Sequence, residues 1–174
     1  MWWSDRITGP VGRRAVLKLG LAGGAAAGLS ACGFTPVYGP GGTGTALRNT
    51  VVIDKADSVE GYLFVQAVET QLGHATQPTY RLAWDMAVVE EGQAITPNNE
   101  TTRYSVIGAV NYRLMKIGSD DVLASGRIES FTGYSATGTT VETLAAERDA
   151  HARLMALLAE RVVTRLFATA DLSG

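Results

Sequence analysis

The sequence predicts an α+β fold, a two-layer sandwich in which about four mostly antiparallel strands carry two helices on one face. Apolar and polar residues alternate with period two in three long runs between residues 80 and 134, which is typical of strands with one buried face. A stretch from Val141 to about Ala168 contains no Gly or Pro and is rich in Ala, Leu, Glu and Arg, as a long helix is. A shorter helical pattern precedes the strands, so the predicted order is β-α-β-β-β-α, and packing the helices on the sheet buries its apolar face.

The first strand and the first helix follow from short local signals. Residues 50–54 are rich in β-branched side chains, which favours a strand. Asp57 stands three positions before Glu60, the spacing of a capping box, and predicts a helix over about residues 58–72. Gly73 is a typical residue to end that helix. The expected apolar face consists of Val65, Val68 and Leu72.

Three alternating runs give the remaining strands. The first covers residues 80–88, the second about 104–114, and the third begins at 122 and ends near 134. A turn over residues 118–121 separates the last two, since Gly, Ser and Asp favour tight turns. The positions expected to face inward in the second and third runs are Tyr104, Val106, Gly108, Val110, Tyr112, Leu114, Ala124, Gly126 and Ile128.

The last helix has both a start signal and an apolar stripe. Thr139 or Thr140 is the expected N-cap, and Glu142 lies where the helix dipole favours a negative charge. Helical periodicity then gathers one apolar face. Its members are Leu154, Met155, Leu157, Leu158, Val162 and Leu166.

Residues 1–31 have the pattern of a lipoprotein signal peptide. Arg13, Arg14 and Lys18 form a basic region, and an apolar run over residues 19–29 follows. That run is too short for a transmembrane helix, which needs ~20 apolar residues. The basic region also resembles the twin-arginine export motif, although Val16 stands where the motif prefers Phe. Twin-arginine export and ordinary Sec export therefore both remain open.

The end of this leader contains the single cysteine of the chain. Residues 29–32, Leu-Ser-Ala-Cys, resemble the bacterial lipobox, in which the thiol accepts a diacylglyceryl group before cleavage. A lone thiol in an exported chain has no internal disulfide partner, so Cys32 is expected to carry the covalent lipid. Gly33 follows it instead of the Asp that favours inner-membrane retention. We therefore expect the protein at the periplasmic face of the outer membrane.

The mature chain divides into a tether and one domain. Residues 39–46 are rich in Gly, Pro and Thr and have no periodicity, as flexible linkers do. The expected organisation is a signal peptide over residues 1–31, a lipid-anchored flexible tether over 32–46 and a single α+β domain over 47–170.

Charge and motif content exclude several classes of function. Beyond residue 31 the chain has 11 basic and 16 acidic residues, a net charge of −5, which argues against nucleic-acid binding. No arrangement typical of a catalytic or metal site appears. His74 is expected in a solvated loop, His151 on the flank of a helix, and the pair Glu90-Glu91 in a solvated turn. The sequence thus predicts a protein that is not an enzyme and has no metal or cofactor beyond its lipid.

A basic surface is the remaining candidate for binding. Four cations could gather on the polar face of the central strands and recognise a phosphorylated lipid. The alternative is ordinary solubilising charge, including cross-strand pairs with Asp85 and Glu129. The four residues are Arg103, Arg113, Lys116 and Arg127.

The start of the mature chain resembles a known family. Residues 32–39, Cys-Gly-Phe-Thr-Pro-Val-Tyr-Gly, are similar to the opening of the LptE (RlpB) family of lipopolysaccharide-assembly lipoproteins. The order of elements and the Gly61-Tyr62-Leu63 stretch resemble that family too. The resemblance implies a small sheet with two helices on one side. It also implies a plug in the lumen of the β-barrel LptD that helps the barrel assemble and deliver lipopolysaccharide.

The resemblance transfers one functional residue, the lipidated Cys32. Some members bind lipopolysaccharide directly, and the acidic charge of this domain speaks against that activity here. The resulting hypothesis is an outer-membrane lipoprotein that partners an LptD-like barrel in lipopolysaccharide transport. The alternative is a generic periplasm-facing lipoprotein module that binds another envelope complex. A lipid-anchored hydrolase is a third class, and no nucleophile–base pair supports it.

Overall fold

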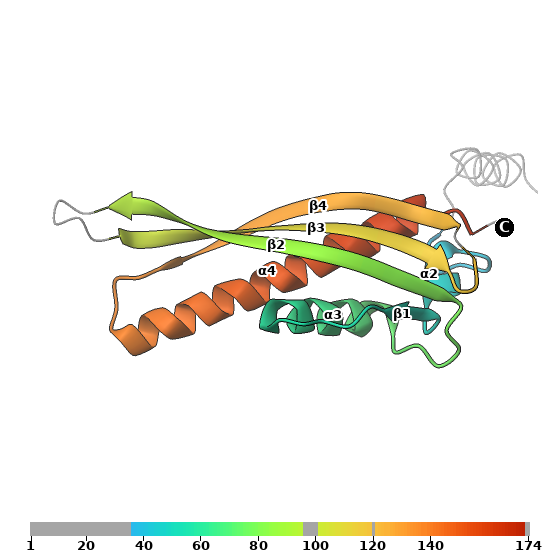
Figure 1. Cartoon of the computed structure of the whole chain (residues 1–174), viewed down its shortest axis with the longest axis horizontal. Coiled ribbons are helices and arrows are strands. Elements are labelled where there is room, and N and C mark those ends of the chain that lie inside the picture. Colours follow the sequence, from blue (N-terminus) through green and yellow to red (C-terminus); the bar gives the residue numbers. More distant parts are fainter. Residues whose placement is uncertain (1–35, 96–100, 120, 173–174) are drawn as a thin grey trace, which may run out of the picture. The chain divides into compact units, whose positions relative to one another are not determined.

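Four strands form one sheet in the order β1-β2-β3-β4 (Figure 1). Strand β1 runs parallel to β2, and the other neighbours are antiparallel. The strands are β1 Val51–Ile53, β2 Tyr80–Ile95, β3 Thr101–Lys116 and β4 Val122–Ser135. The coordinates are a computed structural model that describes residues 36–95, 101–119 and 121–172. Cys32 and the predicted signal peptide lie outside the described residues.

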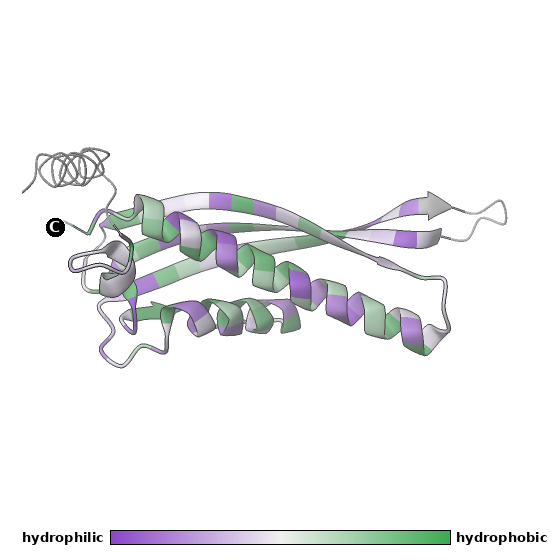
Figure 2. Cartoon of the chain, turned by 180° about the vertical axis from the view of Figure 1, so that it is seen from behind, coloured by the Kyte–Doolittle hydropathy of each residue, from purple (hydrophilic) through white to green (hydrophobic). Residues whose placement is uncertain are grey.

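Two helices pack side by side on one face of this sheet (Figure 1). They are α3, Val59–Leu72, and α4, Thr140–Thr169. A short helix, α2 at Thr43–Leu47, contacts α4. Figure 2 shows hydrophobic and hydrophilic residues mixed along α4, as an amphipathic helix requires. The predicted α+β class and element order are therefore confirmed.

The hydrophobic core fills the space between the sheet and the two long helices. Even-numbered residues of β2, β3 and β4 point toward the helices. For example, Leu82 and Leu114 are paired across β2 and β3, and both are fully buried. Helix α4 crosses β3 closely at Gly108. A β-carbon there would lie 2.9 Å from Leu158 Cδ1 and 3.1 Å from Leu154 Cδ2, so the missing side chain permits the approach.

The helix ends follow their predicted signals with one shift. Thr139 and Glu142 form a complete capping box at the start of α4. Hydrogen bonds from Thr139 to its carboxylate lower the pKa of Glu142. Helix α3 is capped by Ser58, whose side chain accepts the Gly61 N–H at 3.0 Å, and not by the expected Asp57. Gly73, with φ of 79°, ends α3 as predicted.

Part of the predicted tether is ordered in the structure. Residues 43–47 form α2, whose Leu47 is fully buried in the core. The Gly44 N–H donates to the Val37 carbonyl at 2.9 Å, and the Tyr38 ring meets Phe167 of α4 with centroids 5.6 Å apart. Packing against α4 thus orders residues whose composition alone suggests a flexible chain.

Strand β2 is longer than the alternation predicts. It pairs with β3 up to Ile95, with irregular register beyond Gly92. Glu90 and Glu91 therefore lie within a strand and point to opposite faces, and the predicted solvated turn is wrong. In the described part of the chain, no helix is both long and apolar enough to span a membrane.

Candidate functional site

The face of the sheet opposite α3 and α4 carries no covering element among the described residues (Figure 1). Odd-numbered side chains of β2, β3 and β4 point to this uncovered face, since the strand period is two. The register places them in rows of three across the strands. This open sheet face is a surface through which the fold can meet a partner.

One row on the uncovered face is entirely apolar. Val89 is opposite Ile107, and Ile107 is opposite Phe131. Val89 is 54% exposed and Phe131 is 72% exposed, while Ile107 between them is half-buried. We call these three residues the apolar row. Exposed apolar side chains that lie together in this way mark an interaction surface.

A hollow of about 750 Å³ lies on the same face, nearer to β1. Arg81 donates two hydrogen bonds to Asp54, Nε to Oδ1 at 2.6 Å and Nη2 to Oδ2 at 2.8 Å. This pairing raises the pKa of Arg81. Asn111 donates to Asp85 at 2.8 Å. The hollow is lined by Asp54, Arg81, Ala83, Trp84, Asp85, Asn111, Tyr112, Arg113, Met115, Ser125 and Gly126.

The structure does not bring all four predicted cations together. Arg113 lines the hollow. Arg127 lies on β4 opposite Asn111 and pairs with Glu129 at 2.7 Å. Arg103 is on the same strand and face as Arg113, but ten positions away, which is roughly 34 Å at a rise of ~3.4 Å per residue. Lys116 is even-numbered, so it belongs to the opposite face of β3 from Arg103 and Arg113. It lines a smaller hollow with Tyr80 and other residues at the end of the sheet.

The predicted cross-strand charge pairs take a different form. Glu129 pairs with Arg127 two positions away on the same strand, and Asp85 accepts from Asn111 instead of a cation. The hollow therefore contains two cations, Arg81 and Arg113, together with two carboxylates, Asp54 and Asp85. Such a balanced set does not favour the binding of a phosphorylated lipid.

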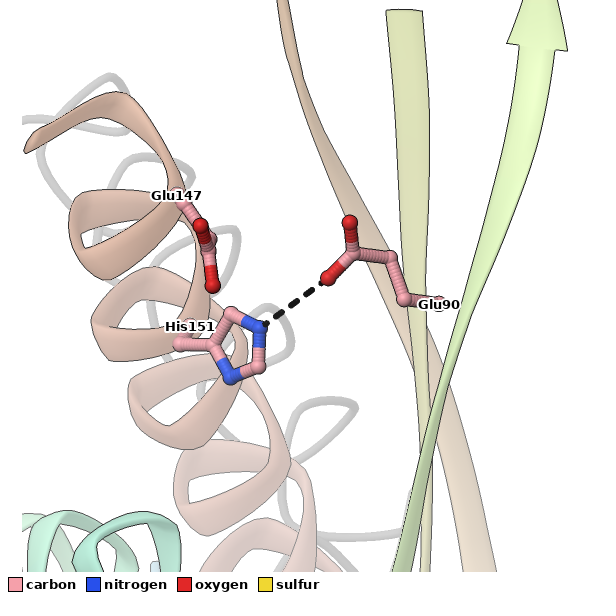
Figure 3. Close-up of side chains that lie close together, drawn as sticks. All are labelled: Glu90, Glu147 and His151. Carbon is pink, nitrogen blue, oxygen red and sulfur yellow. Dashed lines mark ion pairs between the residues drawn. The ribbon is translucent and has the colours of Figure 1, made fainter. Parts of the chain in front are cut away.

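A polar cluster lies on the other side of the sheet, between β2 and α4 (Figure 3). His151 faces Glu60 and Glu90, with its Nδ1 3.2 Å from Glu60 Oε1 and its Nε2 3.8 Å from Glu90 Oε2. The His151 side chain is 19% exposed, so the flank of α4 on which it lies is a partly buried one. Two sequence signals could have found the cluster. Glu90 is an even-numbered position, like the residues of β2 that face the helices, and Glu147 and His151 have helical i, i+4 spacing.

Comparison with known proteins places the chain among envelope lipoproteins. The family model "LptE: Lipopolysaccharide-assembly" matches residues 48–166. A solved structure described as a lipoprotein of Caulobacter crescentus is 19% identical, with a TM-score of 0.62, over 75% of this chain and 96% of its own. Rare lipoprotein B of Shewanella oneidensis is 11% identical, with a TM-score of 0.53, over 69% and 93%. At these identities the two structures support the fold alone. No curated protein matches the sequence.

Proposed function

Because this chain belongs to the LptE family of lipopolysaccharide-assembly lipoproteins, we propose that it plugs an LptD-like outer-membrane β-barrel and assists its assembly. The family is not enzymatic, and the chain is a lipoprotein of lipopolysaccharide assembly. The observation that carries the proposal is the family match over residues 48–166, which spans the sheet from β1 and most of α4.

The uncovered face supplies a suitable contact surface for such a barrel. The lumen of an outer-membrane barrel is largely polar, so a plug needs a surface that mixes hydrogen-bonding groups with limited apolar area. The face offers the Arg81–Asp54 and Asn111–Asp85 pairs at one end and the apolar row beyond them. We propose that this face meets the inner wall of the barrel.

The lipid anchor explains the proposed location. Each buried CH₂ of a lipid chain contributes ~0.8 kcal/mol, and two or more chains give stable membrane attachment. A bacterial lipoprotein cysteine carries several chains, so Cys32 would hold the domain at the periplasmic face of the outer membrane.

Depletion of the protein tests the proposed function. Loss of the lipoprotein should lower the amount of the mature barrel and the amount of lipopolysaccharide at the cell surface. A depleted strain that keeps normal levels of both would refute the proposal. Re-expression of the wild-type chain is the control, because it must restore both quantities.

A further inference from the structure

The polar cluster between β2 and α4 has the composition of a metal site, and this inference does not rest on the proposed function. We propose that Glu90, Glu147 and His151 bind one zinc ion. The candidate ligand atoms of these three residues all lie within 4.8 Å of one another. Figure 3 shows the Glu147 and Glu90 carboxylates on either side of the His151 ring. Glu147 and His151 come from successive turns of α4, and Glu90 comes from β2.

Carboxylate oxygens face both ring nitrogens of His151. Both ring nitrogens are buried and have no hydrogen-bond partner among the described residues. Each nevertheless faces a carboxylate oxygen, Nδ1 that of Glu60 and Nε2 that of Glu90. A neutral imidazole has one N–H and one bare lone pair, so one nitrogen would repel the oxygen in front of it. A cation at that nitrogen removes the repulsion.

The separation at Nε2 fits a metal better than a shared proton. The distance of 3.8 Å from Nε2 to Glu90 Oε2 is too long for a hydrogen bond. Two ligands held tetrahedrally at zinc bond lengths of 2.0–2.2 Å lie roughly 3.4 Å apart. The observed gap therefore closes onto zinc with a side-chain movement of a few tenths of an ångström.

One of the three ligands already has a second-shell hydrogen bond, and a carboxylate stands near a second. Glu60 stands 3.2 Å from His151 Nδ1, the position of the carboxylate in a carboxylate–histidine–zinc arrangement. It would hold the proton on Nδ1 and leave Nε2 free to bind the metal. The Tyr134 hydroxyl donates to Oε1 of Glu90, which leaves Oε2 for coordination. Tyr134 is itself held by a stacked Tyr104 ring at 5.2 Å.

The mixture of ligand types selects the metal. An imidazole nitrogen with carboxylate oxygens suits zinc and neighbouring transition metals, whereas calcium and magnesium prefer oxygen ligands alone. Three carboxylates, those of Glu60, Glu90 and Glu147, surround one imidazole, so a divalent cation offsets charge that the cluster otherwise leaves unbalanced. Glu60 and Glu90 keep about a third of their side-chain exposure, 33% and 32%, which gives the ion a path from solvent.

Calorimetric titration with zinc chloride tests the site. The full lipidated chain, purified in mild detergent and stripped of metal with a chelator, should bind one equivalent of zinc. His151→Gln should weaken the affinity at least tenfold, and Glu60→Gln should weaken it about tenfold or more as the loss of a second-shell partner does. His74→Gln is the matched control, because the His74 side chain is 83% exposed and lies outside the cluster. It should leave the affinity unchanged.

Three results would each overturn the proposal. They are no zinc binding by the wild-type chain at 100-fold molar excess, an unchanged affinity in a folded His151→Gln variant, and displacement of zinc by an equal concentration of calcium. If His151→Gln fails to fold, Glu147→Gln takes its place, since Glu147 is only partly buried at the helix surface. The calcium competition needs no variant and tests the metal preference in either case.

Discussion

The apolar row gives the sharpest prediction about the contact surface, through the single change Phe131→Ser. Phe131 is 72% exposed, so its removal costs the isolated domain little, within ~0.5 kcal/mol for a surface substitution. A phenylalanine side chain buries roughly 200 Å² when it is fully covered. About 140 Å² of that area is still exposed on Phe131 and is available to a partner. At ~25 cal/mol per Å², covering that area contributes about 3.5 kcal/mol to binding. The variant should therefore bind the barrel roughly 300-fold more weakly.

The assay measures how fast the complex dissociates, because interface substitutions act mainly on that rate. Tagged lipoprotein is captured from membranes in mild detergent, and the barrel that remains bound is followed over washing time. Tyr62→Ser is the matched control, an aromatic residue that is 64% exposed on α3 and away from the uncovered face. It should dissociate at the wild-type rate. Wild-type dissociation by a folded Phe131→Ser chain, or an equal effect of Tyr62→Ser, would refute the reasoning.

Three further predictions concern the packing, the helix cap and the anchor. Gly108→Val should lower the free energy of unfolding by about 1–3 kcal/mol in denaturant titration, because it forces a side chain against α4. Ser105→Val, on the other face of β3, is the control and should cause no such loss. Equal losses in the two variants would contradict this prediction. Glu142 has a lowered pKa in the folded state, so its contribution is present above its ordinary pKa and is lost as the pH falls through the folded value. The stability difference between wild type and Glu142→Gln should thus shrink between pH 6 and pH 3, and a constant difference would count against the cap. Cys32→Ser should move the protein from the membrane fraction to the soluble fraction after cell breakage, and retention in the membrane would exclude Cys32 as the anchor site.

The strands and the long helices could be predicted because their signals are local. Alternation over residues 104–114 assigns each side chain to a face without knowledge of the partner strand, and the capping residues of α4 lie within four positions. Helix α2 could not be predicted in this way. It packs against α4, and the nearby Tyr38 meets Phe167, so its surroundings come from residues far apart in the sequence.

The surface could not be predicted because it depends on register between strands. The apolar residues Val89, Ile107 and Phe131 interrupt the alternation of their own strands, and only the pairing shows that they form one row. Three of the four predicted cations are also spread out, in this case along one strand and between its two faces. Arg103 and Arg113 share a face but are ten positions apart on one strand, and the parity of Lys116 turns it to the other side.

The His151 cluster depends on three elements at once. Its members come from α3, β2 and α4, and no pair other than Glu147 and His151 is close in sequence. The end of the first alternating run at Val88 also hid the continuation of β2, which turns Glu90 toward α4. Sequence periodicity therefore located the layers of the fold, while the polar residues trapped between the layers required the structure.

Capture of the tagged protein from membranes in mild detergent, with mass spectrometry of the bound proteins, tests the central claim most directly. The proposed function predicts recovery of a large outer-membrane β-barrel in roughly equal molar amount. Recovery of no barrel, or of a different stable partner in its place, would contradict it.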